Sequence, residues 1–132
     1  RATGIRVASD MFIPAAPNNE IFESLEKFFD RHKKIVLKPN ANGSSIGLHI
    51  VDSRESLLQA WNSVKSAKED YVAEEFIVGR ELTVGVLQTA AGEVALTASE
   101  VIMDRGRQFD YQGKYLGQGS KEITPAQVTT NQ

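Results

Sequence analysis

The chain has 132 residues, with 15 Lys and Arg against 17 Asp and Glu, so its formal net charge at pH 7 is −2. The hydrophobic fraction of 41% and this length predict one domain with a buried core. The near-neutral charge argues against a strongly basic nucleic-acid binder, and no apolar run reaches the roughly 20 residues that a membrane span needs. Because there is no cysteine, disulfides, cysteine-ligated zinc and a thiol nucleophile are excluded.

The chain contains two histidines, and its first residue is not Met. A two-histidine metal site would have to use both His32 and His49. The simpler expectation is that His32 complements a helix dipole and that His49 is a surface residue. The chain opens with Arg1 and has no charged-then-apolar signal segment, so we expect a processed or excised piece of a longer chain.

The first half of the chain predicts two helices that flank a hairpin. Apolar residues recur at helical spacing in two windows, and short apolar runs lie between them. A cluster of Asn, Gly and Ser separates these runs and predicts a polar, flexible hairpin tip. In chain order we expect a helix over 21–29 capped by Asn18 or Asn19, a strand over 35–37, a loop over 40–47 and a strand over 48–51. A second helix follows, which begins at Asp52 in a capping box with Glu55. Its apolar stripe is Leu57, Leu58, Trp61 and Val64.

The second half predicts strands. We expect strands over 71–77, 81–89, 94–97 and 99–103, then a long loop from 104 to 120 that is interrupted by the segment 109–116. The fold class that follows is α+β, with a mainly antiparallel sheet and two helices packed on one face.

The strongest local signal is the loop that begins at Lys38 and ends at Gly47. Its glycines allow a ligand to approach the main chain, while free N–H groups and the hydroxyls of Ser44 and Ser45 can surround phosphate oxygens. Lys38 would neutralise their charge. The alternative is a solvated hairpin turn beside a surface lysine. The segment is neither a Walker A loop nor a G-x-G-x-x-G fingerprint.

A second signal is the run of carboxylates Glu74, Glu75 and Glu81 around a turn at Gly79. Strand alternation places Glu74 and Phe76 on one face and Glu75 and Ile77 on the other. A carboxylate here could hold two ribose hydroxyls, and main-chain groups near Ile77 could bond an adenine edge. The alternative is a set of solvated edge residues.

A third signal is the segment Phe109–Tyr115, in which aromatic and polar residues alternate inside a flexible loop. This pattern suggests a lid, in which Lys114 could cover phosphate and Tyr115 could present a hydroxyl to a substrate. The alternative is a strand with ordinary aromatic packing.

Taken in order, these three segments resemble the ATP-grasp ligases, and in particular the D-alanine–D-alanine ligase family. The resemblance covers nearly the whole chain, and three motifs in order are more specific than any one of them. The matching residues are 35–39 running into 42–47, then 74–84, 109–115 and 124–126.

The resemblance implies an ATP-grasp-type fold, with a small subdomain over about 1–70 and the truncated start of a larger one over about 71–132. It also implies roles for individual residues. Lys38, Gly43, Ser44 and Ser45 would hold ATP phosphates; Glu74, Glu75, Phe76 and Ile77 would form the adenine side, with main-chain contacts at Glu75 and Ile77; Glu81 would hold the ribose hydroxyls; Lys114 would reach the transferred phosphate; and Tyr115 would bond Ser44 near the D-alanine subsite.

Two positions depart from the family pattern. Glu75 stands where lysine is frequent, and Phe109 stands where a tyrosine hydroxyl can occur. The family's N-terminal domain and its acidic and asparagine ligands for Mg²⁺ are not in this chain, so those ligands are expected outside it.

The implied function is the ATP-binding portion of a cytoplasmic ligase that forms D-alanyl-D-alanine for peptidoglycan through an acylphosphate. The partners implied are ATP, D-alanine and the remaining domains of the ligase, without nucleic acid or membrane, and a homodimer is left open. The isolated chain is expected to be inactive. The alternatives are another ATP-grasp carboxylate–amine ligase and a non-catalytic nucleotide-binding module.

Overall fold

The computed structural model describes residues 4–103 and 120–128. The chain divides into two compact units, Arg1–Ile77 and Val78–Gln132, and each is described by itself. The first unit contains, in chain order, β1 (Asp10–Ile13), α1 (Asn19–His32), β2 (Ile35–Pro39), β3 (His49–Val51), α2 (Arg54–Ala67) and β4 (Tyr71–Glu75).

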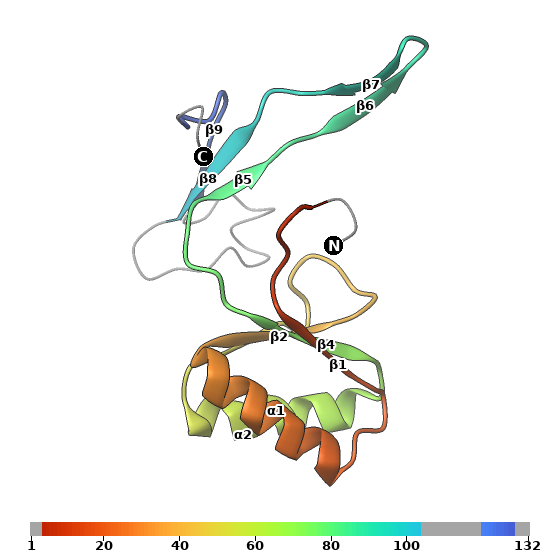
Figure 1. The fold of residues 1–132 in the computed structure, drawn as a ribbon, viewed down its shortest axis with the longest axis vertical. Helices are drawn as coiled ribbons and strands as arrows, with labels where there is room; N and C mark the ends of the chain where they lie inside the picture. The colour runs from red at the N-terminus through yellow and green to blue at the C-terminus, as the bar shows by residue number, and fades with distance from the viewer. Residues whose placement is uncertain (1–3, 104–119, 129–132) are drawn as a thin grey trace. The chain divides into compact units, whose positions relative to one another are not determined.

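The first unit is a four-stranded antiparallel sheet with strand order β1-β4-β2-β3. Figure 1 shows α1 and α2 together on one side of this sheet. The core lies between the two layers, because alternate residues of β2 and β4, among them Leu37 and Ala73, are buried there with Leu25 and Trp61 of the helices. The predicted α+β arrangement, with two helices on one face of an antiparallel sheet, is confirmed.

Helix α1 begins and ends with capping groups of the expected kind. The Asn18 side chain accepts a hydrogen bond from the Ile21 N–H at 3.1 Å, which confirms one of the two predicted caps. Lys33 ends the helix in the left-handed conformation, and its N–H donates to the Phe29 carbonyl at 2.7 Å. Between these caps, the buried residues Leu25 and Phe29 are four positions apart, so they face the sheet together.

Helix α2 begins one residue later than predicted. Ser53, not Asp52, is the N-cap, and its hydroxyl accepts from the Ser56 N–H at 3.1 Å. The reciprocal bond runs from the Ser53 N–H to the Ser56 hydroxyl at 3.0 Å, so Ser56 takes the place expected for Glu55 in the capping box. Aspartate and serine cap helices about equally well, so residue preference alone does not distinguish Asp52 from Ser53.

The apolar stripe of α2 also differs at one position. Its buried residues are Leu57, Ala60, Trp61 and Val64, whereas Leu58 is 52% exposed. The four buried residues fall within an arc of roughly 100° around the helix, and Leu58 lies about 60° beyond the edge of that arc, on the solvent side.

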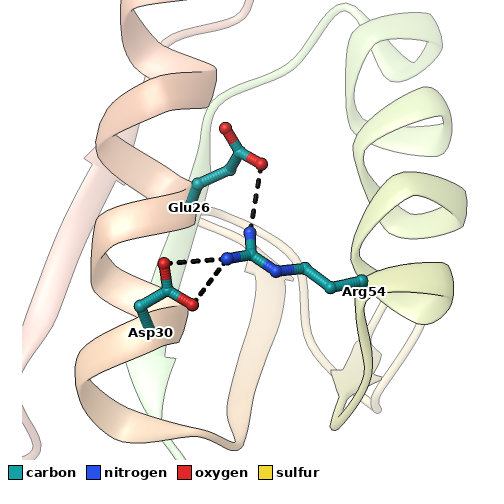
Figure 2. A network of polar contacts seen from close by, with 3 residues as sticks. All are labelled: Glu26, Asp30 and Arg54. Carbon is teal, nitrogen blue, oxygen red and sulfur yellow. Dashed lines mark hydrogen bonds and ion pairs between the residues drawn. The ribbon is translucent and has the colours of Figure 1, made fainter.

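Arg54 joins the start of α2 to the middle of α1. Figure 2 shows its guanidinium between two acidic side chains of α1. Arg54 Nη1 lies 3.1 Å from Glu26 Oε1, and Nη2 lies 2.6 and 2.8 Å from the two oxygens of Asp30. All three side chains are well exposed, so each pair contributes at most about 1 kcal/mol. The network fixes how the helices meet rather than supplying most of their stability.

The second unit, within the part that the structure describes, consists of strands. They are β5 (Glu81–Thr83), β6 (Val86–Thr89), β7 (Gly92–Ala95), β8 (Ser99–Met103) and β9 (Ser120–Ile123). Strands β5, β8 and β9 form one antiparallel sheet in that order, and β6 and β7 form a separate hairpin, as Figure 1 shows. Strand β9 was not predicted.

Three strand predictions were wrong in their boundaries, and one of them, the strand expected over 94–97, is β7 (Gly92–Ala95). The strand expected over 71–77 ends at Glu75, and the strand expected over 81–89 is two strands, β5 and β6. The chain leaves the three-stranded sheet after Thr83, and the Leu96 N–H donates to the Gly85 carbonyl at 2.8 Å just beyond it. A side chain at Gly85 would lie 3.1 Å from Leu96 Cδ1, so the missing Cβ allows the close approach at this break.

Neither helix in the described part of the chain is long and apolar enough to cross a membrane.

Candidate functional site

Lys38 of β2 and Glu74 of β4 lie on the face of the first sheet that the helices leave uncovered. In both strands the buried residues alternate with these partly exposed positions. Glu74 is paired in register with Val36, two residues from Lys38, so the two side chains are diagonal neighbours. Lys38 Nζ lies 2.6 Å from Glu74 Oε2. The two residues predicted from separate motifs are therefore in direct contact.

The loop that follows β2 is conformationally strained at its tip. Ser44 and Ser45 have φ values of 57° and 58°, in the left-handed region that residues other than glycine seldom adopt. The Ile46 N–H donates to the Gly43 carbonyl at 3.2 Å and closes the turn. Strained backbone at neighbouring residues is typical of ligand-binding loops, so the tip is a candidate contact for a ligand.

Both ends of this loop are fixed to the residues that lead into β4. On the first side, the Asn40 N–H donates to the Asp70 carbonyl at 2.8 Å, and the Asn42 amide donates to Glu69 Oε2 at 2.8 Å. On the second side, Gly47 has a φ of +73°, and a Cβ there would lie 2.9 Å from Pro39 Cγ and 3.0 Å from the Tyr71 hydroxyl. The loop thus has a strained tip on fixed ends.

The Tyr71 hydroxyl lies against this loop, and the residue as a whole is buried. Burial, and to a lesser extent the negative charge of Glu69, raises the pKa of Tyr71 above its ordinary value. The hydroxyl therefore stays protonated at neutral pH and presents a neutral group to Gly47.

Glu75 points to the helix side of the sheet, opposite to Glu74, as strand alternation predicted. Glu75 Oε2 lies 3.2 Å from Nδ1 of His32, the last residue of α1, and Oε1 accepts from the Ser9 N–H at 3.0 Å. The next residue, Phe76, donates its N–H to the Lys34 carbonyl at 3.0 Å and has Lys34 Nζ 4.0 Å from its ring centroid. The main chain after β4 is therefore held from two sides.

The histidine expectations were incomplete. His32 does end α1 among basic residues, but its imidazole also pairs with Glu75, which the sequence did not indicate. His49 is half-buried on β3 rather than a plain surface residue, and burial lowers the pKa of its imidazole.

The remaining predicted site residues lie elsewhere in the chain. Ile77 is 66% exposed and follows Phe76 at the end of the first unit. Glu81 is exposed and begins β5 in the second unit. Lys114 and Tyr115 lie outside the described residues.

Arg80, directly before β5, makes a contact that sequence reasoning missed. Its Nε donates to Glu100 Oε1 at 2.6 Å, and its Nη2 donates to Glu100 Oε2 at 2.5 Å and to the Gln127 carbonyl at 2.6 Å. The hydrogen bonds from Arg80 lower the pKa of Glu100; burial opposes this effect, and the Arg80 charge reinforces it. Glu100 is therefore a paired anion in the interior of the second unit.

Over residues 4–103 and 120–128, no three His, Asp or Glu side chains form a group that could hold a metal ion. Lys38 and the loop after β2 carry groups that suit anions, because the strand that bears an ammonium group leads into a turn with two hydroxyls.

Comparisons with known proteins add to this geometry. Residues 3–132 match the family model described as D-ala D-ala ligase C-terminus. A D-alanine–D-alanine ligase of Halalkalibacterium halodurans is 32% identical over 126 residues, which are 96% of this chain and 40% of that protein. The chain thus spans about 40% of the length of this curated relative.

Two solved structures are similar in fold. One is the D-alanyl-alanine synthetase A of Vibrio cholerae, with a TM-score of 0.78, 21% identity, and coverage of 98% of this chain and 39% of that one. The other is the VanG D-Ala:D-Ser ligase of Enterococcus faecalis, with a TM-score of 0.72, 24% identity, and coverage of 98% and 37%. The predicted ATP-grasp-type α+β fold is confirmed.

Proposed function

Because the chain belongs to the D-ala D-ala ligase C-terminus family, we propose that it is the nucleotide-binding part of an ATP-dependent ligase that joins two D-alanine molecules. The observation that carries this proposal is the position of Lys38. Lys38 lies near the end of β2, on the sheet face that the helices leave open, and β2 leads into the loop that carries the strained Ser44–Ser45 turn.

In the proposal, the triphosphate of ATP lies against Lys38 and the loop residues Gly43, Ser44 and Ser45. The ammonium group and the loop N–H and hydroxyl groups oppose the phosphate charge. The base lies beside Glu74, where the main chain at Glu75 and at Ile77 offers it hydrogen bonds.

Three further residues complete the proposed site. Glu81 holds the ribose hydroxyls, Lys114 approaches the phosphoryl group that is transferred, and Tyr115 bonds Ser44 beside the D-alanine subsite. These assignments follow from the family motifs that the residues match.

The proposed reaction has two steps. The terminal phosphoryl group of ATP passes to the carboxylate of one D-alanine, which gives an acylphosphate and ADP. The amine of a second D-alanine then attacks the acyl carbon, so that the peptide bond forms and phosphate leaves with the bonding electron pair. The task of this chain is to position ATP and to stabilise charge, and closure of the loop keeps water from the acylphosphate.

The residues that the structure describes form no group that could hold Mg²⁺. We propose that its ligands lie in the part of the ligase outside this chain, and that the enzyme acts in the cytoplasm in peptidoglycan synthesis.

The likeness in fold to a D-Ala:D-Ser ligase supports a second candidate, in which another amino or hydroxy acid is the acceptor.

A calorimetric titration of the 132-residue chain with MgATP tests the proposal. We expect weak binding without ligation, and Lys38→Met should weaken it about tenfold, which corresponds to about 1.4 kcal/mol. Lys27→Met is the matched control, because Lys27 is exposed on α1 and the charge change is the same. Absence of ATP binding, or an equal loss in the two variants, would contradict the proposal.

A further inference from the structure

We propose that His32 is a positioning residue for the nucleotide base. Through Glu75 it holds the main chain that leads to Ile77, which the proposed function places against adenine. The inference rests on that function and adds a residue from the end of α1, on the opposite side of the sheet from Lys38.

The His32–Glu75 contact joins one imidazole nitrogen to one carboxylate oxygen. A carboxylate oxygen only accepts hydrogen bonds, so the group that faces Glu75 Oε2 at 3.2 Å is the Nδ1 N–H of His32. The His32 side chain is 14% exposed, and that of Glu75 is 32% exposed. A largely buried imidazole therefore meets a carboxylate that solvent only partly reaches.

The other ring nitrogen of His32 has no corresponding task. Among the residues described, His32 Nε2 is the buried side-chain atom without a hydrogen-bond partner. The Phe28 ring packs against the imidazole, with 4.5 Å between centroids. A buried polar atom without a hydrogen-bond partner costs folding free energy. We infer that the contact between His32 Nδ1 and Glu75 offsets this cost.

Glu75 transmits this contact to the main chain. Its second oxygen accepts from the Ser9 N–H, and its own N–H donates to the Ser9 carbonyl, each at 3.0 Å. The following N–H, of Phe76, donates to the Lys34 carbonyl, two residues beyond His32. Residues 75 and 76 are thus fixed between the lead-in to β1 and the end of α1.

Loss of the His32 donor leaves the Glu75 carboxylate bound at Ser9 alone and loosens the segment that leads to Ile77. Contacts to the base should weaken. Contacts of phosphate with Lys38 and the loop after β2 should not, because they lie on the other face of the sheet and do not involve His32.

The test compares two ligands on full-length 132-residue variants. His32→Leu removes the donor and keeps apolar bulk against Phe28, whereas His32→Asn keeps an N–H near the place of Nδ1. Calorimetry with ATP should give roughly tenfold weaker binding for the Leu variant, and inorganic tripolyphosphate should bind within about twofold of wild type. The Asn variant should restore most of the ATP affinity. His49→Leu is the matched control and should change the affinity for neither ATP nor tripolyphosphate.

A second measurement needs no nucleotide. Amide hydrogen exchange should quicken at Ser9 and Phe76 in His32→Leu and stay near wild type in His32→Asn. If His32→Leu does not fold, Glu75→Gln gives the same test. The amide of the Gln side chain has one acceptor oxygen, which cannot serve both His32 Nδ1 and the Ser9 N–H.

The outcomes separate the two proposals. If wild type binds no ATP, the proposed function fails and this inference fails with it. If wild type binds ATP and His32→Leu binds it equally well, only the inference is overturned. An equal loss of ATP and tripolyphosphate would show a general structural role and would also overturn it.

Discussion

At the scale of single residues, the backbone strain of the loop after β2 is concentrated at Ser44 and Ser45. Ser44 and Ser45 adopt left-handed conformations despite their Cβ atoms, whereas Gly47 adopts one without that steric conflict. Gly47 is also the residue whose missing side chain lets the loop pack against Pro39 and Tyr71. The glycine therefore fixes the loop's return path, and the serines carry the strain at its tip.

Gly47→Ala should lower the free energy of unfolding by about 1–3 kcal/mol, because it adds a Cβ both at positive φ and into two close contacts. Gly43→Ala is the matched control. Gly43 lies in the same loop, and a Cβ there meets nothing within 4 Å. Urea denaturation of the two variants measures the difference, and similar midpoints for both would count against this account of the loop.

At the scale of elements, Arg80 joins three parts of the second unit. It stands directly before β5, bonds Glu100 in β8, and reaches the carbonyl of Gln127 beyond β9. A bidentate arginine–carboxylate pair has a fixed geometry, so it specifies the register of the two strands as well as their attraction.

This pair predicts a pH dependence of stability. Because Arg80 lowers the pKa of Glu100, the stabilisation is fully present above the ordinary glutamate value of about 4.3 and is lost as the pH falls through the lowered value. Arg80→Met should lower the urea midpoint at pH 7 and reduce the loss that wild type shows below about pH 4. The double variant Arg80→Met with Glu100→Gln should recover part of the midpoint. An unchanged acid profile in Arg80→Met would refute the assignment.

At the scale of the whole molecule, the two units differ in their cores. The cluster of buried apolar residues lies entirely within the first unit, whereas Val101 is the buried apolar residue of the second unit's described part. Apolar residues of β6, such as Val86 at 66% exposure, are open to solvent there. Burial of apolar surface is the main stabilising term, so the first unit should account for most of the stability.

Hydrogen exchange measured amide by amide should reflect this difference. The amides of β2 and β4 should exchange slowest, with opening free energies close to that of global unfolding, and the amides of β6 and β7 should exchange much faster. Exchange followed by NMR across the chain checks this expectation. Protection of β6 equal to that of β4 would show that the second unit has a comparable core.

Much of the first unit could be predicted from its sequence, because its signals are local. The apolar spacing in 21–29 marked a helix, and alternation within β2 and β4 placed Glu74 and Glu75 on opposite faces. Alternation also allowed Lys38 to share a face with Glu74, although the sequence alone did not pair them.

Other features depended on partners that are distant in the sequence. The contact of His32 with Glu75 exists because α1 ends beside the end of β4, and no spacing rule relates the two positions. Strand β9, which reads Ser-Lys-Glu-Ile, lacks an apolar run and is a strand because it pairs with β8. The break at Gly85 likewise follows from the close approach of Leu96.

The ion pair between Lys38 and Glu74 has a consequence for ligand choice. The Glu74 carboxylate lies 2.6 Å from the Lys38 ammonium group and already neutralises its charge. An incoming anion must therefore compete with Glu74 for Lys38. A small inorganic anion that pairs with the ammonium group of Lys38 leaves the Glu74 carboxylate without a partner. A ligand that also brings hydrogen-bond donors gives the released carboxylate a new partner. Exchange of partners at this pair would therefore weaken the binding of inorganic anions relative to molecules that offer negative charge at one end and hydrogen-bond donors at the other.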